Sequence, residues 1–355
     1  MDVGPLVGIL MYVIGGAAGA SFYLPFKKVK NWAWESYWLI YCVAGLVVGP
    51  WLLAFTMSPN VLSVLSQTPT STLLLCYLFG AMWGAGGLTW GLMIRYLGVG
   101  LGVAIGCGLC AAVGTLVPPL VLGELAELLG KEGGSSALAA WVVGVGVSLL
   151  GIVLTGMAGM SKQREMSDAE KKTAVAEFNF SKGIAVAIFS GVMSAGMAFG
   201  IQMAKHGIVP LTHTVAPATP ETWQGLPGLV VVLLGGFTVN VIWCVLLNLK
   251  NRTGGDYAKP STPLALNYVL SALAGIVWYS QMVFYTIGDS KIGTFSFSGW
   301  SVFMSSQIIF STLWGIALLE WKGTSRRTHK LLAAGLAVLL ASLVIIGYGN
   351  SLKPP

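Results

Sequence analysis

The chain contains the stretch FYLPFKKVKNWAWESYW at residues 22–38, which separates two long apolar segments. One apolar run ends at Pro25, three lysines follow, and a second apolar run begins near Trp34. Two explanations fit this pattern. The stretch is either a basic patch for a nucleic acid or a lipid, or a turn between two buried helices.

The whole chain is strongly apolar, which favours the second explanation. Of its 355 residues, 55% are hydrophobic and 9% are charged, and the mean hydropathy is +0.78. Soluble domains carry about 25% charged residues, so this composition predicts a protein that crosses a lipid bilayer several times. The net charge of +7 is then explained by membrane topology, and no nucleic-acid partner is expected.

Ten apolar segments are long enough to cross a bilayer, which takes about 20 residues in a helix. Lipid offers the backbone no hydrogen-bond partners, and the runs show no strict apolar–polar alternation, so each segment is predicted to be a helix. The approximate ranges are 5–25, 34–56, 70–92, 98–121, 137–160, 182–204, 226–249, 264–287, 292–318 and 331–349. The expected fold class is an all-α integral membrane protein with ten transmembrane helices.

The basic residues are unevenly distributed between the two sides that ten helices imply. One side receives only Lys131, Lys205, Lys291 and Lys353, and the other receives the remaining 16 of the 20 Lys and Arg residues. The positive-inside rule makes the second side cytoplasmic. Both termini are therefore predicted to lie outside, and the 22–38 stretch forms the first cytoplasmic turn.

A mixed-charge linker at 161–181 divides the chain into two halves of five helices, 1–160 and 182–355. Five is an odd number, so the two halves enter the membrane in opposite senses. A Gly-x-x-Trp motif occurs at 80–83 and again at 275–278, and a glycine follows each tryptophan 15 residues later.

The first helix of each half also shows matching glycines, Gly8 with Gly183 and Gly16 with Gly191. Together these matches predict an inverted repeat, which is typical of secondary transporters that bind a substrate near the midplane.

The helix predicted at 292–318 carries hydroxyl groups along one face, including Ser301 and Ser305 near its middle. A face of hydroxyls suits a hydrated cavity for a sugar or an ion, although hydroxyls also bond back to their own helix. Asn240 is an amide inside an apolar run. It is expected either to form an interhelical hydrogen bond or to contact the substrate.

The helix predicted at 264–287 places Trp278, Gln281 and Tyr285 on one face, and Trp83 and Trp90 are seven residues apart in the third helix. Aromatic faces and amide groups suit a small, mostly apolar pocket for a sugar. Aromatic residues at helical spacing also commonly serve packing or the membrane interface. These five residues, together with Asn240, Ser301 and Ser305, are the eight candidate substrate-binding residues.

No ionisable residue lies in the middle of an apolar segment, where proton-coupled carriers commonly keep one. Coupling or gating candidates therefore lie near helix ends: Lys27, Glu35, Arg95, Asp289 and Glu320. Glu35 either favours the N-terminus of the second helix or pairs with a lysine as a cytoplasmic latch.

Motifs for chemistry or for ATP binding are not found. The pair Cys107-x-x-Cys110 lacks a second pair and a nearby histidine, so it does not predict a metal site. The chain also has no Walker A motif and no nucleophile–base constellation. The sequence therefore predicts a protein that is not an enzyme and has no metal or cofactor.

Several stretches resemble the L-rhamnose–proton symporter family of the drug/metabolite transporter superfamily: GASFYLPFKKVKNWAWESYW, LFGAMWGAGGLTWGLMIRYLGVGLG, AEFNFSKGIAVAIFSGVMSAGMAFG, WYSQMVFYTIGDSKI and LLEW. The resemblance covers nearly the whole chain. It implies ten helices in two inverted five-helix repeats, a bacterial cytoplasmic membrane, and uptake of L-rhamnose with protons. The family carries an Asp and a His where this chain has Ser296 and Phe303, so a related sugar or a different coupling is an alternative.

The expected function is thus proton-coupled uptake of L-rhamnose or a closely related deoxy sugar by alternating access. The expected partners are the sugar and the lipid bilayer, and the pattern does not indicate an oligomeric state. The alternatives are export of a drug or metabolite, sodium-coupled transport of another small neutral solute, and a membrane sensor that binds a sugar without transporting it.

Overall fold

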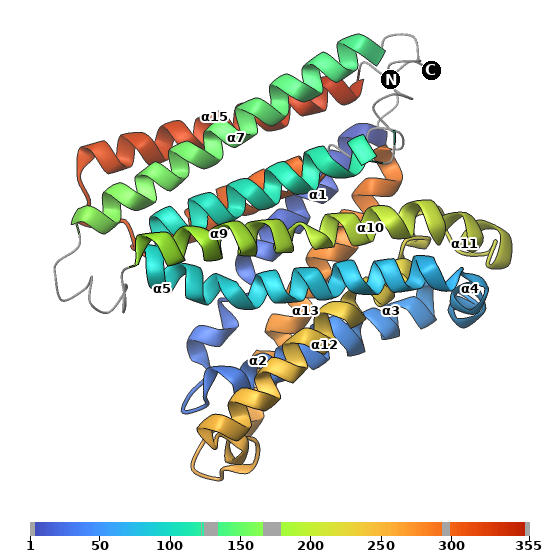
Figure 1. Ribbon diagram of the computed structural model, residues 1–355, viewed down its shortest axis with the longest axis horizontal. Coiled ribbons are helices and arrows are strands. Elements are labelled where there is room, and N and C mark those ends of the chain that lie inside the picture. Colours follow the sequence, from blue (N-terminus) through green and yellow to red (C-terminus); the bar gives the residue numbers. More distant parts are fainter. Residues whose placement is uncertain (1–3, 122, 124–133, 166–178, 293–298, 352–355) are drawn as a thin grey trace. The chain divides into compact units, whose positions relative to one another are not determined.

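The computed structural model describes residues 4–121, 123, 134–165, 179–292 and 299–351 (Figure 1). Within these ranges the regular structure is helical, and no strand occurs. The expectation of an all-α protein is therefore confirmed for the part of the chain that the structure describes.

The helices follow the apolar segments closely. In the first part of the chain they are α1 (Gly4–Ser21), η1 (Pro25–Lys28), α2 (Trp34–Cys42), η2 (Val43–Val48), α3 (Gly49–Met57), α4 (Val61–Gln67), α5 (Thr70–Val121) and α7 (Gly134–Glu165). In the second part they are α9 (Phe180–Ser194), α10 (Gly196–Gly207), α11 (Val209–Val215), η3 (Glu221–Trp223), α12 (Leu226–Asn251), η4 (Gly254–Ala258), α13 (Leu264–Ile292), α14 (Gly299–Ala317) and α15 (Arg326–Ser351).

Eight helical stretches in the described residues are long and apolar enough to cross a membrane. They are Leu6–Lys28, Trp34–Met57, Thr70–Ile94, Leu138–Glu165, Ser181–Val215, Glu221–Asn251, Leu264–Ile292 and Arg326–Gly349. The fourth expected segment appears as a shorter apolar helix, Ile105–Val121. The ninth appears as α14, a helix of 19 residues with four serines that is not among the eight.

The segment Trp34–Met57 is interrupted by η2, a π-helical turn. Pro50 follows this turn and has no backbone N–H to continue the regular hydrogen-bond ladder. A single wider turn is a common way for a helix to accommodate such a break. The segment therefore crosses as α2, η2 and α3 in succession.

The long helix α5 is not straight. A Cβ atom on Gly102 would lie 3.1 Å from Met93, and one on Gly106 would lie 2.9 Å from the sulfur of the same methionine. In a straight helix, residues nine apart are separated by about 14 Å along the axis. The chain therefore turns back between Ile94 and Gly102, and the two limbs seen in Figure 1 correspond to the third and fourth expected segments.

The chain forms two compact units. Unit 1 comprises Met1–Ala17, Gly86–Ala198 and Gly288–Pro355. Within it α7 and α15 lie side by side and antiparallel (Figure 1). Glycines allow this close approach, because a Cβ on Gly144 would meet Ile346 and a Cβ on Gly151 would meet Leu339. Small residues commonly let helix backbones pack closely in membranes.

Unit 2 comprises Ala18–Ala85 and Phe199–Ile287. In this unit α12 packs against α2, η2 and α3. Gly45 lies directly against the backbone of Gly275 in α13, and Gly80 of α5 lies against the backbone of Val232 in α12. Each glycine stands where a side chain would collide with a neighbouring backbone.

Candidate functional site

Trp83 and Trp278 stack on each other inside unit 2. Their ring centroids are 5.0 Å apart and their planes differ by 28°. Trp278 is 6% exposed, and its edge meets Tyr41 with a centroid distance of 6.2 Å. Stacked and edge-on contacts are the preferred geometries of aromatic pairs, so these rings hold each other in place.

The aromatic contacts continue along α2. Tyr41 and Trp38 have centroids 4.7 Å apart, and Trp38 stacks on Trp34 at 4.9 Å. These residues follow each other at steps of four and three, so they share one face of the helix. We call Trp34, Trp38, Tyr41, Trp83 and Trp278 the aromatic chain.

Asn240 of α12 is bonded on both sides of its amide group. Its Oδ1 accepts a hydrogen bond of 2.9 Å from Nε1 of Trp38, and its Nδ2 donates one of 2.8 Å to the carbonyl of Gly236. The ring of Trp83 packs on Gly236, where a Cβ atom would overlap it. The sequence left two roles open for Asn240, an interhelical hydrogen bond or a substrate contact. The structure contains the interhelical hydrogen bond, which joins α12 to α2.

Gln281 lies one helical turn beyond Trp278 and is 2% exposed. The hydroxyl of the neighbouring Tyr279 is buried without a partner among the described residues. An unpaired buried polar group is unfavourable by about 1–3 kcal/mol, so such groups call for a ligand or a water molecule.

The sequence pattern also predicts Tyr285 for this site, and it is buried on the same face of α13 at 1% exposure. Five of the eight candidate substrate residues therefore lie in unit 2: Trp83, Asn240, Trp278, Gln281 and Tyr285. Trp83 and Trp278 are in direct contact, and Asn240 joins them through Gly236.

The other three candidates, Trp90, Ser301 and Ser305, belong to unit 1. Nε1 of Trp90 donates a hydrogen bond of 2.9 Å to Oγ of Ser194, and the ring packs in an apolar cluster with Met93. The hydroxyl groups of Ser305 and Ser148 are 2.7 Å apart. Ser301 is buried at 2% exposure.

Glu35 is the most deeply buried of the four coupling or gating candidates whose side chains the structure describes, at 5% exposure. Its Oε1 accepts hydrogen bonds from Nδ2 of Asn251 at 2.9 Å and from Oγ1 of Thr253 at 2.8 Å. The carboxylate lies in the first turn of α2. It is thus at the helix N-terminus as expected, but its partners are neutral side chains rather than a lysine.

Three of the remaining coupling candidates, Lys27, Asp289 and Glu320, are more exposed than Glu35. Asp289 is half-buried and accepts a hydrogen bond of 3.4 Å from the hydroxyl of Tyr12. Lys27 and Glu320 are exposed. The side chain of Arg95 lies outside the described residues, as do Ser296 and most of the linker at 161–181.

Metal-binding chemistry finds no support in the described residues, where no group of three His, Cys, Asp or Glu side chains comes together. Cys107 and Cys110 are free thiols within α5. The prediction of no metal site stays a prediction.

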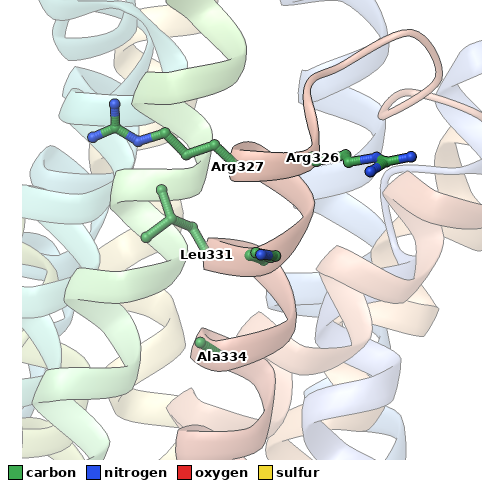
Figure 2. Close-up of a pocket in the computed structure, with 5 residues that line it drawn as sticks. Arg326, Arg327, Leu331 and Ala334 are labelled. Atoms are coloured by element: carbon green, nitrogen blue, oxygen red, sulfur yellow. The ribbon is translucent and has the colours of Figure 1, made fainter.

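A surface pocket lies along the first turns of α15 and is lined by Arg326, Arg327, Lys330, Leu331 and Ala334 (Figure 2). Its polar side chains are all cationic. Such a lining suits an anion rather than a neutral sugar, so we do not assign this pocket to the sugar.

Sequence reasoning missed three members of the site, Trp38, Tyr41 and Tyr279. For the first two a signal was available, because Trp34, Trp38 and Tyr41 follow a helical spacing within and just after the 22–38 stretch. For Tyr279 no signal distinguishes it from the other aromatic residues of an apolar helix.

Many apolar helices of membrane-spanning length, packed through glycines around buried aromatic and amide groups, define a polytopic α-helical membrane protein with a polar site among its helices. The chain belongs to the L-rhamnose-proton symport protein (RhaT) family, which it matches over residues 1–352. This is a family of transporters rather than of enzymes.

Curated relatives cover nearly the full length of the chain. A protein of Cronobacter sakazakii is 36% identical over 349 residues, which are 97% of each chain. One of Klebsiella pneumoniae is 35% identical over 349 residues, again 97% of each chain. One of Yersinia pestis is 34% identical over 350 residues, which are 97% of this chain and 98% of the relative. All three are named L-rhamnose-proton symporter.

Proposed function

We propose that this protein carries L-rhamnose, or a closely related deoxy sugar, into the cell together with protons by alternating access. The names of the full-length relatives support this substrate and this coupling ion. The observation that carries the proposal for this chain is the amide side chain of Gln281, which is 2% exposed and lies one turn from the Trp83–Trp278 stack.

The chemistry of a deoxy sugar matches these groups. Its methyl group and C–H faces are apolar, and its hydroxyl groups need hydrogen-bond partners once water is removed. Trp278 supplies an aromatic surface for the apolar face, and Gln281 bonds a hydroxyl. Tyr285 and Asn240 complete this group, with Asn240 offering its second N–H. Trp90, Ser301 and Ser305 stay predictions as sugar ligands.

Matching contacts in unit 1 support the inverted repeat. A Cβ on Gly8 would lie 2.5 Å from Ile292. A Cβ on Gly183, the counterpart of Gly8, would lie 2.5 Å from Leu97. Ile292 and Leu97 are 195 residues apart, the same separation as between the two Gly-x-x-Trp motifs. The first and sixth helices therefore make equivalent contacts with the eighth and third.

In unit 2, other helices of the two proposed repeats also make matching contacts. Gly45 lies against Gly275, and Val232 lies against Gly80, the counterpart of Gly275. Gly49 approaches Tyr279 in the same way as Gly236 approaches Gly84. Gly45 and Gly49 precede Val232 and Gly236 by one common separation of 187 residues, so α12 repeats the contacts that η2 and α3 make.

These pairs favour an architecture of ten transmembrane helices in two inverted five-helix repeats, 1–160 and 182–355, joined by the linker 161–181. Drug/metabolite transporters are built in this way, as the resemblance implies. Inverted repeats provide two conformations of similar energy that open to opposite sides, which is the requirement of alternating access.

The proposed location is the bacterial cytoplasmic membrane, with both termini outside. The uneven distribution of Lys and Arg supports this orientation. The proton is the proposed coupling ion, and Lys27, Glu35, Arg95, Asp289 and Glu320 are the proposed coupling or gating residues.

Purified protein in proteoliposomes tests the function directly. We expect L-rhamnose counterflow, and we expect added sugar to make the outside medium more alkaline as protons enter with it. Uptake that follows a sodium gradient and ignores a proton gradient would support the sodium-coupled alternative. Sugar binding without counterflow would support a sensor.

A further inference from the structure

Glu35 is the only Asp, Glu, Lys, Arg or His that is more than nine-tenths buried among the side chains that the structure describes. It also makes no ion pair with a described basic residue. Burying a carboxylate without a cation is unfavourable unless hydrogen bonds compensate. The surroundings of Glu35 therefore determine whether it holds its charge.

The hydrogen bonds to Glu35 end on one oxygen. Asn251 and Thr253 both donate to Oε1, and Oε2 accepts none from another described residue. The N-terminus of α2 adds an attractive interaction with the negative charge. The charged form thus has good partners, while Oε2 leaves a position on which a proton can be added.

A second carboxylate belongs to the same network. Oδ2 of Asp256 accepts a hydrogen bond of 2.7 Å from the backbone N–H of Ala33 and one of 2.9 Å from Oγ of Ser36. Thr253 also donates to Oδ1 of Asn248 at 3.1 Å, and Ser36 is 3.3 Å from the same oxygen. Hydroxyl and amide groups therefore connect Glu35 to Asp256.

The network joins two segments that are far apart in the sequence. The backbone of Lys30 both donates to and accepts from the side chain of Asn267, at 3.1 and 2.8 Å. Tyr268 bonds the carbonyl of Tyr257 at 2.9 Å. We call the hydrogen-bonded segments 30–36 and 248–268 the polar latch. It ties the turn between α1 and α2 to the loop between α12 and α13.

We propose that Glu35 is the protonatable residue that opens and closes the polar latch. This inference rests on the proposed proton symport for its role in the transport cycle. The latch itself is defined by the contacts above. It would link the proton to the accessibility of one end of unit 2.

The direction of the effect follows from the hydrogen bonds. A proton from hydronium adds to Oε2 of Glu35, which leaves a neutral acid and one water molecule. The bonds from Asn251 and Thr253 then lose their charge-assisted character and weaken. The attraction to the N-terminus of α2 is lost as well. Proton binding therefore favours the open latch, and proton release favours the closed latch.

The same result follows from linkage. The closed latch binds the anion better than the neutral acid, so it opposes protonation, and by reciprocity protonation opposes closure. Opening should increase as the pH falls.

Other titratable groups face this region. Tyr37 lies on the same helix, Cys244 on α12 and Tyr257 on η4. Tyr and Cys side chains ordinarily titrate above neutral pH, and burial raises the pKa of Tyr257 further. Lys250 and Arg252 are exposed at the end of α12. Asp256 is the other carboxylate of this network, so its variant is a necessary control.

Hydrogen–deuterium exchange of the full-length protein in proteoliposomes tests the proposal without sugar. Exchange of peptides within 30–36 and 248–258 is measured at several pH values and divided by the intrinsic rate at each pH. In the wild type we expect protection to fall by about tenfold or more on acidification, because two charge-assisted bonds weaken. In Glu35→Gln we expect the low protection at every pH.

Two matched variants sharpen the test. Asp256→Asn removes the other carboxylate of the network and should keep a pH dependence. Glu165→Gln changes an exposed carboxylate that bonds Ser325 and Thr328 in unit 1, and it should leave the latch unchanged. The same pH dependence in Glu35→Gln as in the wild type would overturn the proposal, as would its loss in Asp256→Asn alone.

Transport assays separate this inference from the proposed function. If the proposed function holds, Glu35→Gln should retain L-rhamnose counterflow and lose about tenfold or more of proton-driven accumulation. A wild type without any L-rhamnose or proton flux would contradict the proposed symport. The pH dependence of hydrogen–deuterium exchange would still test the role of Glu35 in the polar latch.

Discussion

Trp83 and Trp278 stack with ring centroids 5.0 Å apart, and they are equivalent residues of the two Gly-x-x-Trp motifs. Residues that a two-fold axis relates can touch each other only close to that axis. The stack is therefore the contact expected if the axis of the proposed inverted repeat lies close to these two rings. Substrates of transporters with this symmetry bind near the repeat interface.

Replacing Trp278 tests the aromatic part of the site. We expect Trp278→Ala to lower L-rhamnose uptake about tenfold or more, because a stacking surface worth about 1 kcal/mol or more is lost along with its packing. Trp278→Phe keeps an aromatic face and should retain most uptake. Trp243 on α12 is 45% exposed, so Trp243→Phe serves as a control. Full uptake by Trp278→Ala would remove this residue from the site.

Gln281 offers a test in which stability and function move in opposite directions. Gln281→Leu replaces a buried amide with an apolar side chain of similar size, so we expect an equal or higher melting temperature in the absence of sugar. The same variant should raise the KM for L-rhamnose about fivefold or more, because a hydrogen bond to the sugar is lost. Thermal melting and initial uptake rates measure the two effects. Unchanged affinity in Gln281→Ala would contradict the pocket assignment.

Asn240 provides a comparison for Gln281, because its amide group forms hydrogen bonds with Trp38 and Gly236. Asn240→Leu leaves Nε1 of Trp38 without its acceptor. We therefore expect a loss of about 1–3 kcal/mol in the free energy of unfolding and a lower melting temperature. A variant as stable as the wild type would show that the hydrogen bond to Trp38 contributes little.

Gly80 tests the close approach of helices in unit 2. A Cβ atom at this position would overlap the backbone carbonyl of Val232, so Gly80→Ala should destabilise the protein by about 1–3 kcal/mol. Gly87 in the same helix has no neighbour within 4 Å of the added atom. Gly87→Ala should leave thermal melting unchanged or slightly improved, since alanine favours a helix. Equal melting temperatures for the two variants would contradict this packing.

The predicted orientation is tested by cysteine labelling. Lys28 and Asn60 are both exposed and lie in turns on opposite sides of the predicted second helix. A membrane-impermeant maleimide added to intact cells should label Asn60→Cys and spare Lys28→Cys. In inside-out vesicles the pattern should reverse. Labelling of Lys28→Cys in intact cells would invert the proposed topology. Four of the five native cysteines are buried, which keeps the background low.

Much of the fold could be predicted from the sequence because the bilayer restricts the possibilities. Apolar runs of about 20 residues must form helices when the surrounding solvent cannot bond the backbone. The exact bounds of the helices, and breaks within them, were harder to predict from hydropathy. The fourth and ninth expected segments are not among the eight spans, and Pro50 lies just after a π-helical turn that hydropathy does not report.

Less of the candidate site could be predicted. Helical spacing correctly placed Trp278, Gln281 and Tyr285 on one buried face. It could not reveal that Asn240 and Ser305 already have partners in Trp38 and Ser148. Whether a buried polar group has a hydrogen-bond partner depends on residues more than a hundred positions away. The sequence of a single helix does not identify those residues.

The sequence by itself determined the class of protein, the positions of the apolar helices, the motifs that repeat and the family, because these follow from local composition and order. Only the tertiary structure decided how the 22–38 stretch is used. Its Glu35 bonds Asn251 and Thr253, and its Trp38 bonds Asn240. Hydrogen bonds require atoms within about 3 Å, and contacts between α2 and α12 form only when the chain folds.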